Sequence, residues 1–326
     1  FPSLNEARTY WRRLHGDDGH VVPRHVDLWG HATMYLCFVL LGLTELCGVL
    51  VLRYRPDDAA SNDLARAAAL GGSAARDLDI PTVAKTHNYV KLKYYKSIDH
   101  LVPTTSKQRA YLIDNGVPSG DISHIPNFSS ISPSPNAIDS YDTNLDVIAI
   151  GRLVHKKGFD ILLEAVAEIH QSGIGIRLSI AGDGPEMCAL RERVRVLQIS
   201  NIVSFLGWQS SVQDCLTRAN VFVLPSRDEP FGIVVLEAMA LNVPVIATRT
   251  DGPLEMLDDD IALLIDREDM RGLVAALENI AQDYSAAWAR ADAARQRFNE
   301  RYSEAVVVAS YEALYGALIE QHATRK

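Results

Sequence analysis

Short runs of apolar residues, many of them β-branched, alternate along most of the chain with stretches whose apolar residues recur every three or four positions. The short runs are typical of buried strands, and the longer pattern is typical of helices that bury one face. The alternation is regular from residue 146 onward. It predicts strands at 146–150, 177–181, 202–206, 221–224, 243–247 and 262–265, with helices between them and three more at about 268–283, 285–300 and 304–322. Strands that alternate with helices indicate βαβ units and parallel sheets.

The amino-terminal half is less regular, and it predicts strands at 81–85, 100–105 and 122–125 and a helix at 106–115. Residues 34–52 are almost wholly apolar and are long enough to cross a bilayer. Glu45 lies near the middle of this stretch, where a carboxylate costs about 2.5–3.5 kcal/mol on membrane-insertion scales. The stretch is therefore interpreted as a buried core helix, with a contact on one membrane face as the alternative.

A change of composition divides the chain. Residues 127–144 are rich in Ser, Pro and Asn, as linkers are. A length of 326 residues also favours about two domains. We predict an amino-terminal domain at 1–130, a second domain at 143–303, and a helix at 304–326 that packs back on the first domain.

The charge of the chain argues against nucleic-acid binding, and its cysteines indicate the cellular compartment. Residues 1–127 carry 14 Lys and Arg against 13 Asp and Glu, whereas residues 128–326 carry 18 against 28. A chain with a net charge of -9 is a poor candidate for general nucleic-acid binding. None of its four cysteines forms a C-x-x-C pair, so free thiols in a reducing cytoplasm are expected.

The first candidate site is Gly151-Arg152, followed by Lys157-Gly158, between the strand at 146–150 and the next helix. Ligands of open α/β sheets bind at the carboxyl ends of strands. A glycine there lets the backbone approach a ligand, and two cations beside a helix start suit a diphosphate. Two solvated basic residues at a helix start are an equally good interpretation of the spacing alone.

The second candidate site contains two glutamates, Glu229 and Glu237, eight positions apart. The first lies in a loop and the second on the following helix, whose N–H groups form an anion site at its start. Carboxylates on either side of that site could accept hydrogen bonds from a sugar and from a ribose. Alternatively, Glu229 is a partner of the helix dipole and Glu237 is a surface residue.

The order of these motifs resembles the donor-binding domain of family 4 glycosyltransferases. The motifs are GRL-x3-KG, GDGP, FLG, PS-x2-EPFG-x4-EAMA and a later G-x-x-E; they are strong over 146–257, and the resemblance extends more weakly over about 75–320. It implies the α/β fold called GT-B, in which two Rossmann-like domains face each other across a cleft and the last helix crosses back. That family usually opens with a strand and a Gly-Gly loop. Here Leu4-Asn5 stands where the glycines are expected and the first strand is absent from the pattern.

The resemblance also implies roles for individual residues. Arg152 and Lys157, next to Gly151, would hold the donor diphosphate, Glu229 would meet the transferred sugar, and Glu237 would bind the ribose hydroxyls. The backbone of three further residues would cradle the phosphates: Phe231, Gly232 and Ile233. His87, which follows the strand at 81–85, matches a histidine that contacts the sugar near the reaction centre. A lone histidine after a strand is otherwise more often structural.

The resemblance implies a retaining transferase that moves a sugar from a UDP- or GDP-sugar to an acceptor hydroxyl. By analogy with the family, we expect it to act in the synthesis of a cell-envelope glycan or glycolipid, such as lipopolysaccharide. The alternative is a non-catalytic nucleotide-sugar-binding subunit or scaffold. No metal and no other cofactor is expected. The D-x-D matches at 77–79 and 258–260 are not placed like metal-diphosphate sites, and cations with a helix end can stabilise a departing diphosphate.

One further surface is predicted at 89–96, where lysines and tyrosines interleave. Such a segment suits an anionic acceptor or a membrane interface, and a solvated helix face is the alternative. We therefore expect a cytoplasmic protein, with the inner face of the cytoplasmic membrane as a possible place of action.

Overall fold

The computed structural model describes residues 35–39, 49–53, 68, 72–73, 75–76, 80–131 and 143–324. Contacts divide the chain into two units. One contains the described residues up to Ile125 together with those from Ala309 onward, and the other is Pro126–Val308.

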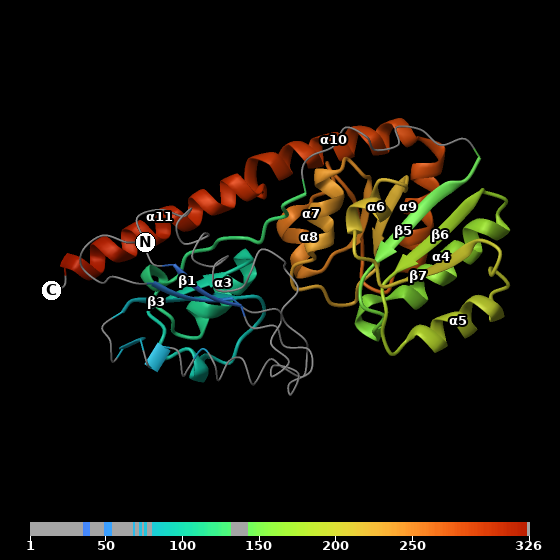
Figure 1. Cartoon of the computed structure of the whole chain (residues 1–326). Helices are drawn as coiled ribbons and strands as arrows, with labels where there is room; N and C mark the ends of the chain where they lie inside the picture. Colours follow the sequence, from blue (N-terminus) through green and yellow to red (C-terminus); the bar gives the residue numbers. More distant parts are fainter. Residues whose placement is uncertain are drawn as a thin grey trace, which may run out of the picture. The chain divides into compact units, whose positions relative to one another are not determined.

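The second unit is built on a six-stranded sheet in the order β10-β9-β8-β5-β6-β7, in which every pairing is parallel. Its strands, partly green and yellow in Figure 1, are β5 (Leu145–Ile150), β6 (Ile176–Ala181), β7 (Val203–Gly207), β8 (Val221–Leu224), β9 (Val245–Thr248) and β10 (Leu263–Ile265). All six predicted strands are confirmed, with bounds that differ by at most two residues. Parallel strands with helical connections place all their carboxyl ends at one edge of the sheet.

Helices cover both faces of this sheet. They are α4 (Phe159–Gln171), α5 (Met187–Val196), α6 (Val212–Leu216), α7 (Ile233–Ala240), α8 (Asp251–Met256), α9 (Met270–Gln282) and α10 (Tyr284–Arg301). Side chains alternate along β5, as they must in a strand. Leu145 and Val147 join a cluster with α4, α5 and α9, whereas Ile148 and Ile150 join a second cluster with α6, α7 and α10. The core is therefore two apolar layers on either side of one sheet.

The first unit contains a four-stranded sheet in the order β1-β2-β3-β4. Its elements are β1 (Tyr35–Val39), β2 (Val49–Arg53), β3 (Thr82–Thr86), η1 (Leu92–Tyr94), β4 (His100–Pro103), α3 (Ser106–Asp114) and η2 (Ser119–Asp121). The long helix α11 (Glu304–Thr324) has residues in both units. Within the first unit, the Lys85 ammonium lies 5.2 Å from the centre of the Tyr311 ring.

The core helix predicted at 34–52 is wrong. The described parts of this stretch are β1 and β2, which pair antiparallel, and β2 then pairs parallel with β3. Short apolar runs fit strands and buried helices equally well, so the pattern alone did not distinguish them. Only nine residues separate β1 from β2, which is too short for the crossover that parallel strands need, and this explains their direction. Among the described residues, no helix is long and apolar enough to span a membrane.

The strand predicted at 122–125 is also wrong as an independent element. Its residues run beside β4, where Ser123 N–H donates to Leu101 and Ile125 N–H donates to Pro103, at 3.1 and 3.2 Å. Only Ile122 forms a bridge, opposite Leu101. Pro103 has no N–H with which to continue the ladder, so the pairing stops after one residue. The expected first strand of the family cannot be compared, because residues 1–34 lie outside the described part of the chain.

Candidate functional site

Glycine loops bring the carboxyl ends of β5, β6 and β7 into direct backbone contact. Gly151 N–H donates to Ala181 at 3.0 Å, and Gly182 N–H donates to Gly207 at 2.7 Å. Gly182 has φ of 137°, and a Cβ there would lie 1.9 Å from the Gly151 carbonyl oxygen. This edge therefore requires a glycine, and it exposes backbone where a ligand can approach closely.

An ion pair lies at the same edge, between the Lys157 ammonium and the Glu229 carboxylate. Lys157 ends the short 3-10 helix η3 (His155–Lys157), and Gly158, with φ of 67°, turns the chain into α4. The side chains of Lys157 and Glu229 are only 18% and 8% exposed. The two charges thus compensate each other in a place largely shielded from water.

The start of α7 lies next to Glu229 and has no side-chain cap. Gly232 occupies the cap position with φ of 84°, and a Cβ there would lie 3.2 Å from Glu229 Cγ. Three other helices of this unit, α6, α9 and α10, begin with a capping side chain, whereas α4, α5 and α8 also lack one. A helix start with unfilled N–H groups beside a lysine is suited to bind an anion.

The remaining predicted residues of the second unit differ in exposure. Phe231 is 5% exposed and packs into the core, so only its backbone is available to a ligand. Ile233 is 40% exposed in the first turn of α7, and Glu237 is half-buried further along the same helix. Arg152 is exposed in the loop after β5. Gly151 thus lies beside Lys157, which pairs with Glu229, and Glu229 lies beside Gly232.

His87 follows β3 and belongs to the first unit, so the structure does not place it relative to the ion pair. The nearby segment 89–96 contains the short 3-10 helix η1. Tyr89 is 46% exposed, and Lys91, Lys93 and Lys96 are exposed as well.

Sequence reasoning missed a network around Arg227, the third residue after β8. Its guanidinium donates two hydrogen bonds of 2.8 Å to Asp160, one of 2.9 Å to Glu268, and one of 2.8 Å to the His155 carbonyl oxygen. Burial on its own would raise the pKa of the Asp160 carboxyl, but hydrogen bonds and charge from Arg227 outweigh it and hold that pKa below its usual value. The same bonds raise the pKa of Arg227.

The acidic loop at 258–260 is engaged by arginines. Asp258 pairs with Arg297 at 2.8 Å, and Asp259 accepts two hydrogen bonds from Arg249, at 2.7 and 2.9 Å. The other D-x-D match, 77–79, lies outside the described residues.

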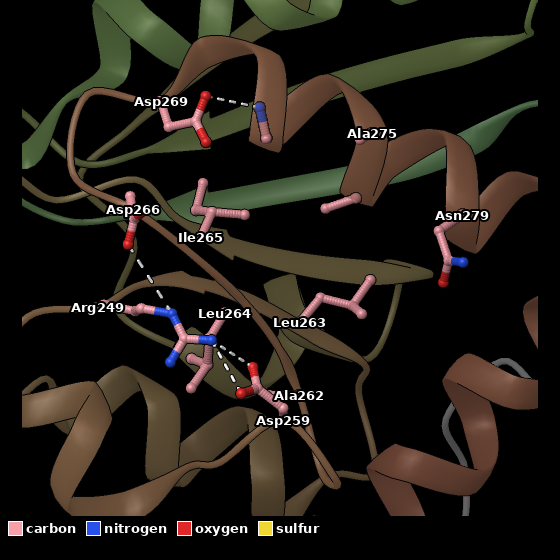
Figure 2. Close-up of a pocket in the computed structure, with 12 residues that line it drawn as sticks. Arg249, Asp259, Ala262, Leu263, Leu264, Ile265, Asp266, Asp269, Ala275 and Asn279 are labelled. Carbon is pink, nitrogen blue, oxygen red and sulfur yellow. Dashed lines mark hydrogen bonds and ion pairs between the residues drawn. The ribbon is translucent and has the colours of Figure 1, made fainter.

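A separate open groove of about 500 Å³ lies between β10 and α9 (Figure 2). Arg249 reaches Asp259 on one side and Asp266 on the other, the latter at 4.0 Å. Asp269 caps α9 through the Gly272 N–H at 2.8 Å. None of the residues predicted to bind a donor lines this groove.

Comparison with known proteins identifies a family. Residues 131–300 match the model of the family described as glycosyl transferases group 1. The chain is 33% identical over 227 residues to LpsE of Rhizobium meliloti, a lipopolysaccharide core biosynthesis glycosyltransferase, covering 68% of this chain and 65% of that protein. It is 30% identical over 173 residues to the glycogen synthase of Mycobacterium tuberculosis, covering 52% of this chain and 42% of that enzyme. The chain thus spans less than two thirds of these relatives.

Among solved structures, HepE of Anabaena in complex with UDP-glucose superposes with a TM-score of 0.67 at 20% identity, covering 78% of this chain and 76% of that one. At this identity the likeness concerns the fold. The expected GT-B class, with Rossmann-like α/β units, is confirmed.

Proposed function

We propose that this chain, which belongs to the glycosyl transferases of group 1, transfers a sugar from a nucleoside diphosphate sugar to an acceptor hydroxyl. The observation that carries the proposal is the Lys157–Glu229 pair beside the uncapped start of α7. A cation, a carboxylate and free helix N–H groups at the carboxyl edge of a parallel sheet match the parts of a nucleotide-sugar.

In this proposal the donor lies along that edge. Arg152, Lys157 and the backbone of Phe231, Gly232 and Ile233 bind the diphosphate, with Gly151 leaving room for it. Glu229 accepts hydrogen bonds from the transferred sugar, and Glu237 accepts them from the ribose. Because these cations and N–H groups stabilise the negative charge of the departing diphosphate, the reaction is proposed to need no metal.

The configuration at the transferred carbon is proposed to be retained. The acceptor hydroxyl attacks from the face that the diphosphate leaves, and a phosphate oxygen accepts the proton from that hydroxyl. His87 is proposed to contact the sugar near the reacting carbon. No covalent intermediate with the protein is required.

The nucleobase is proposed to lie near the end of β7. Trp208 follows Gly207 and is 76% exposed, more than any other large apolar side chain among the described residues. An exposed indole offers a flat face for stacking, which is worth about 1–3 kcal/mol for a base. HepE was solved with UDP-glucose, so UDP-glucose is the first donor to test.

The proposed product is a cell-envelope glycan or glycolipid, by analogy with LpsE. The exposed tyrosine and lysines of 89–96 are proposed to contact an anionic acceptor or membrane at the cytoplasmic face.

Slow hydrolysis of the donor tests the proposal without an acceptor. Wild-type protein should release glucose from UDP-glucose, initially with the configuration that it has in the donor, as followed by NMR. Lys157→Met should lower the rate by about 100-fold or more, because one stabilising cation is lost at the leaving group. Arg177→Gln, at the opposite end of the strands, serves as the control. Equal rates in wild type and Lys157→Met would contradict the proposal, and binding of UDP-glucose without hydrolysis would favour the scaffold.

A further inference from the structure

The two members of the Lys157–Glu229 pair come from loops 72 residues apart in the sequence. Lys157 lies between β5 and α4, and Glu229 lies between β8 and α7. Neither loop is part of the sheet ladder, so something else must hold them in register for the two side chains to meet.

Backbone bonds join the two loops on the amino-terminal side of Lys157. The Lys156 carbonyl oxygen accepts hydrogen bonds from Arg227 N–H at 2.8 Å and from Asp228 N–H at 3.3 Å. On the other side of Lys157 the loops touch, because a Cβ on Gly158 would lie 2.0 Å from the Pro225 carbonyl oxygen.

The Arg227 side chain strengthens the same junction. Its guanidinium donates one hydrogen bond to the His155 carbonyl oxygen in η3 and two parallel hydrogen bonds to the Asp160 carboxylate in the first turn of α4. Glu268 holds the Nε atom from the segment before α9. The Arg227 side chain is 17% exposed, whereas the side chains of Asp160 and Glu268 are 39% and 65% exposed, so the guanidinium is the sheltered part of the network.

These bonds leave Arg227 little capacity to bind a ligand itself. A guanidinium has five N–H groups, and four of them already have protein acceptors. The Lys157 ammonium, in contrast, lies at the candidate site, where it pairs with Glu229. Arg227 therefore acts by holding other residues in place and not by binding a ligand.

We propose that Arg227 is a positioning residue, which locks the β5–α4 loop to the loop after β8 so that Lys157 and Glu229 meet in the geometry that receives a donor. This inference rests on the proposed function for its effect on donor binding. The effect on the Lys157–Glu229 pair itself follows from the contacts alone. A lysine cannot replace Arg227, because it lacks the planar fork that binds Asp160 and His155 together.

Titration with UDP, GDP and ADP by calorimetry measures the effect on donor binding. For the nucleotide that wild type binds, Arg227→Gln should raise Kd by about tenfold, within the usual coupling of residues in one network. Arg227→Lys should not restore the affinity. Asp160→Asn, a smaller change, should raise Kd by about threefold or more. Arg249→Gln, a matched arginine paired with Asp259, should stay within about twofold. Unchanged affinity in Arg227→Gln and Asp160→Asn would overturn the proposal.

Urea unfolding tests the positioning without any ligand. Lys157→Met should lower the unfolding midpoint in wild type, and its effect should fall to about half or less in the Arg227→Gln background, because the pair is already loosened. If Arg227→Gln does not fold, Asp160→Asn provides the second background. An equal shift in both backgrounds means that Arg227 only stabilises the fold, and it would overturn the proposal. If wild type binds no nucleotide, the proposed function fails, while this measurement still decides the role of Arg227.

Discussion

Lys157 and Glu229 depend on each other because both are mostly shielded from water. With Glu229 8% exposed, removal of its cation leaves a carboxylate that neither water nor protein compensates well. The pair is thus a stability feature as well as a candidate binding feature.

We predict that Lys157→Met lowers the free energy of unfolding by about 2 kcal/mol, less than for a fully buried pair because Lys157 retains some exposure. Glu229→Gln in addition should restore part of this loss, since the uncompensated charge is then gone. Urea denaturation of the two single variants and the double variant measures the coupling. Additive losses would show that the pair does not exist in solution.

Asp160 provides a pH-dependent contribution. The pKa of Asp160 is lowered in the folded protein because the hydrogen bonds and charge of Arg227 outweigh the effect of burial. The ionised carboxylate therefore stabilises the fold fully above the unfolded pKa, near 4. This contribution is lost as the pH falls through the lower pKa of the folded protein. We predict that wild type is more stable than Asp160→Asn at pH 6 and that the difference shrinks as the pH falls below about 4. Denaturation midpoints of both proteins at several pH values check this, and a constant difference would contradict it.

At the scale of elements, the loop between β5 and α4 is held against the end of β8 with no space for a side chain. We predict that Gly158→Ala lowers the free energy of unfolding by about 3 kcal/mol or more, because strain at positive φ adds to a clash with the Pro225 carbonyl oxygen. Gly173→Ala is the matched control, since Gly173 has φ of 87° but nothing within 4 Å of the added Cβ. It should cost only about 1–2 kcal/mol. Equal losses in urea denaturation would mean that the loop has room to move.

The elements also show which parts of the fold were predictable. The strands of the second unit were found because buried parallel strands are short, apolar and separated by helical patterns, and β8 matches at both ends. The β1–β2 pair was misread as a helix because nothing in a run of apolar residues distinguishes the two structures. The strand pairing ends early at Ile122 because of a proline in the neighbouring strand. The pattern of residues 122–125 by itself contains no sign of that proline.

The candidate site was predictable only in part, for a similar reason. Glycines and charged residues next to strand ends are local signals, and they indicated Lys157 and Glu229. Arg227 was missed as a functional residue because its partners Asp160 and Glu268 are 67 and 41 residues away, and the sequence carries no mark of such pairings.

At the scale of the whole molecule, the proposed donor residues all lie in one unit and His87 lies in the other. If the second unit alone binds the nucleotide, His87→Ala should leave Kd for the diphosphate within about twofold while lowering sugar release by about 100-fold, the usual range for a group acting at the reaction centre. Calorimetry and the hydrolysis assay on the same preparation separate the two effects. Loss of nucleotide affinity in His87→Ala would contradict this division of roles.

Calorimetric titration of the whole protein with UDP, GDP and ADP tests the central claim most directly, with Arg152→Ala and Glu237→Ala beside wild type. The proposed donor site predicts that one diphosphate binds with a Kd between about 1 μM and 1 mM, a common range for enzyme substrates, and that each variant weakens it at least about tenfold. Arg177→Ala and Glu168→Ala, exposed residues outside the site, should bind as wild type does. Folded wild-type protein that binds none of the three nucleotides would contradict the claim that this chain uses a nucleotide-sugar donor.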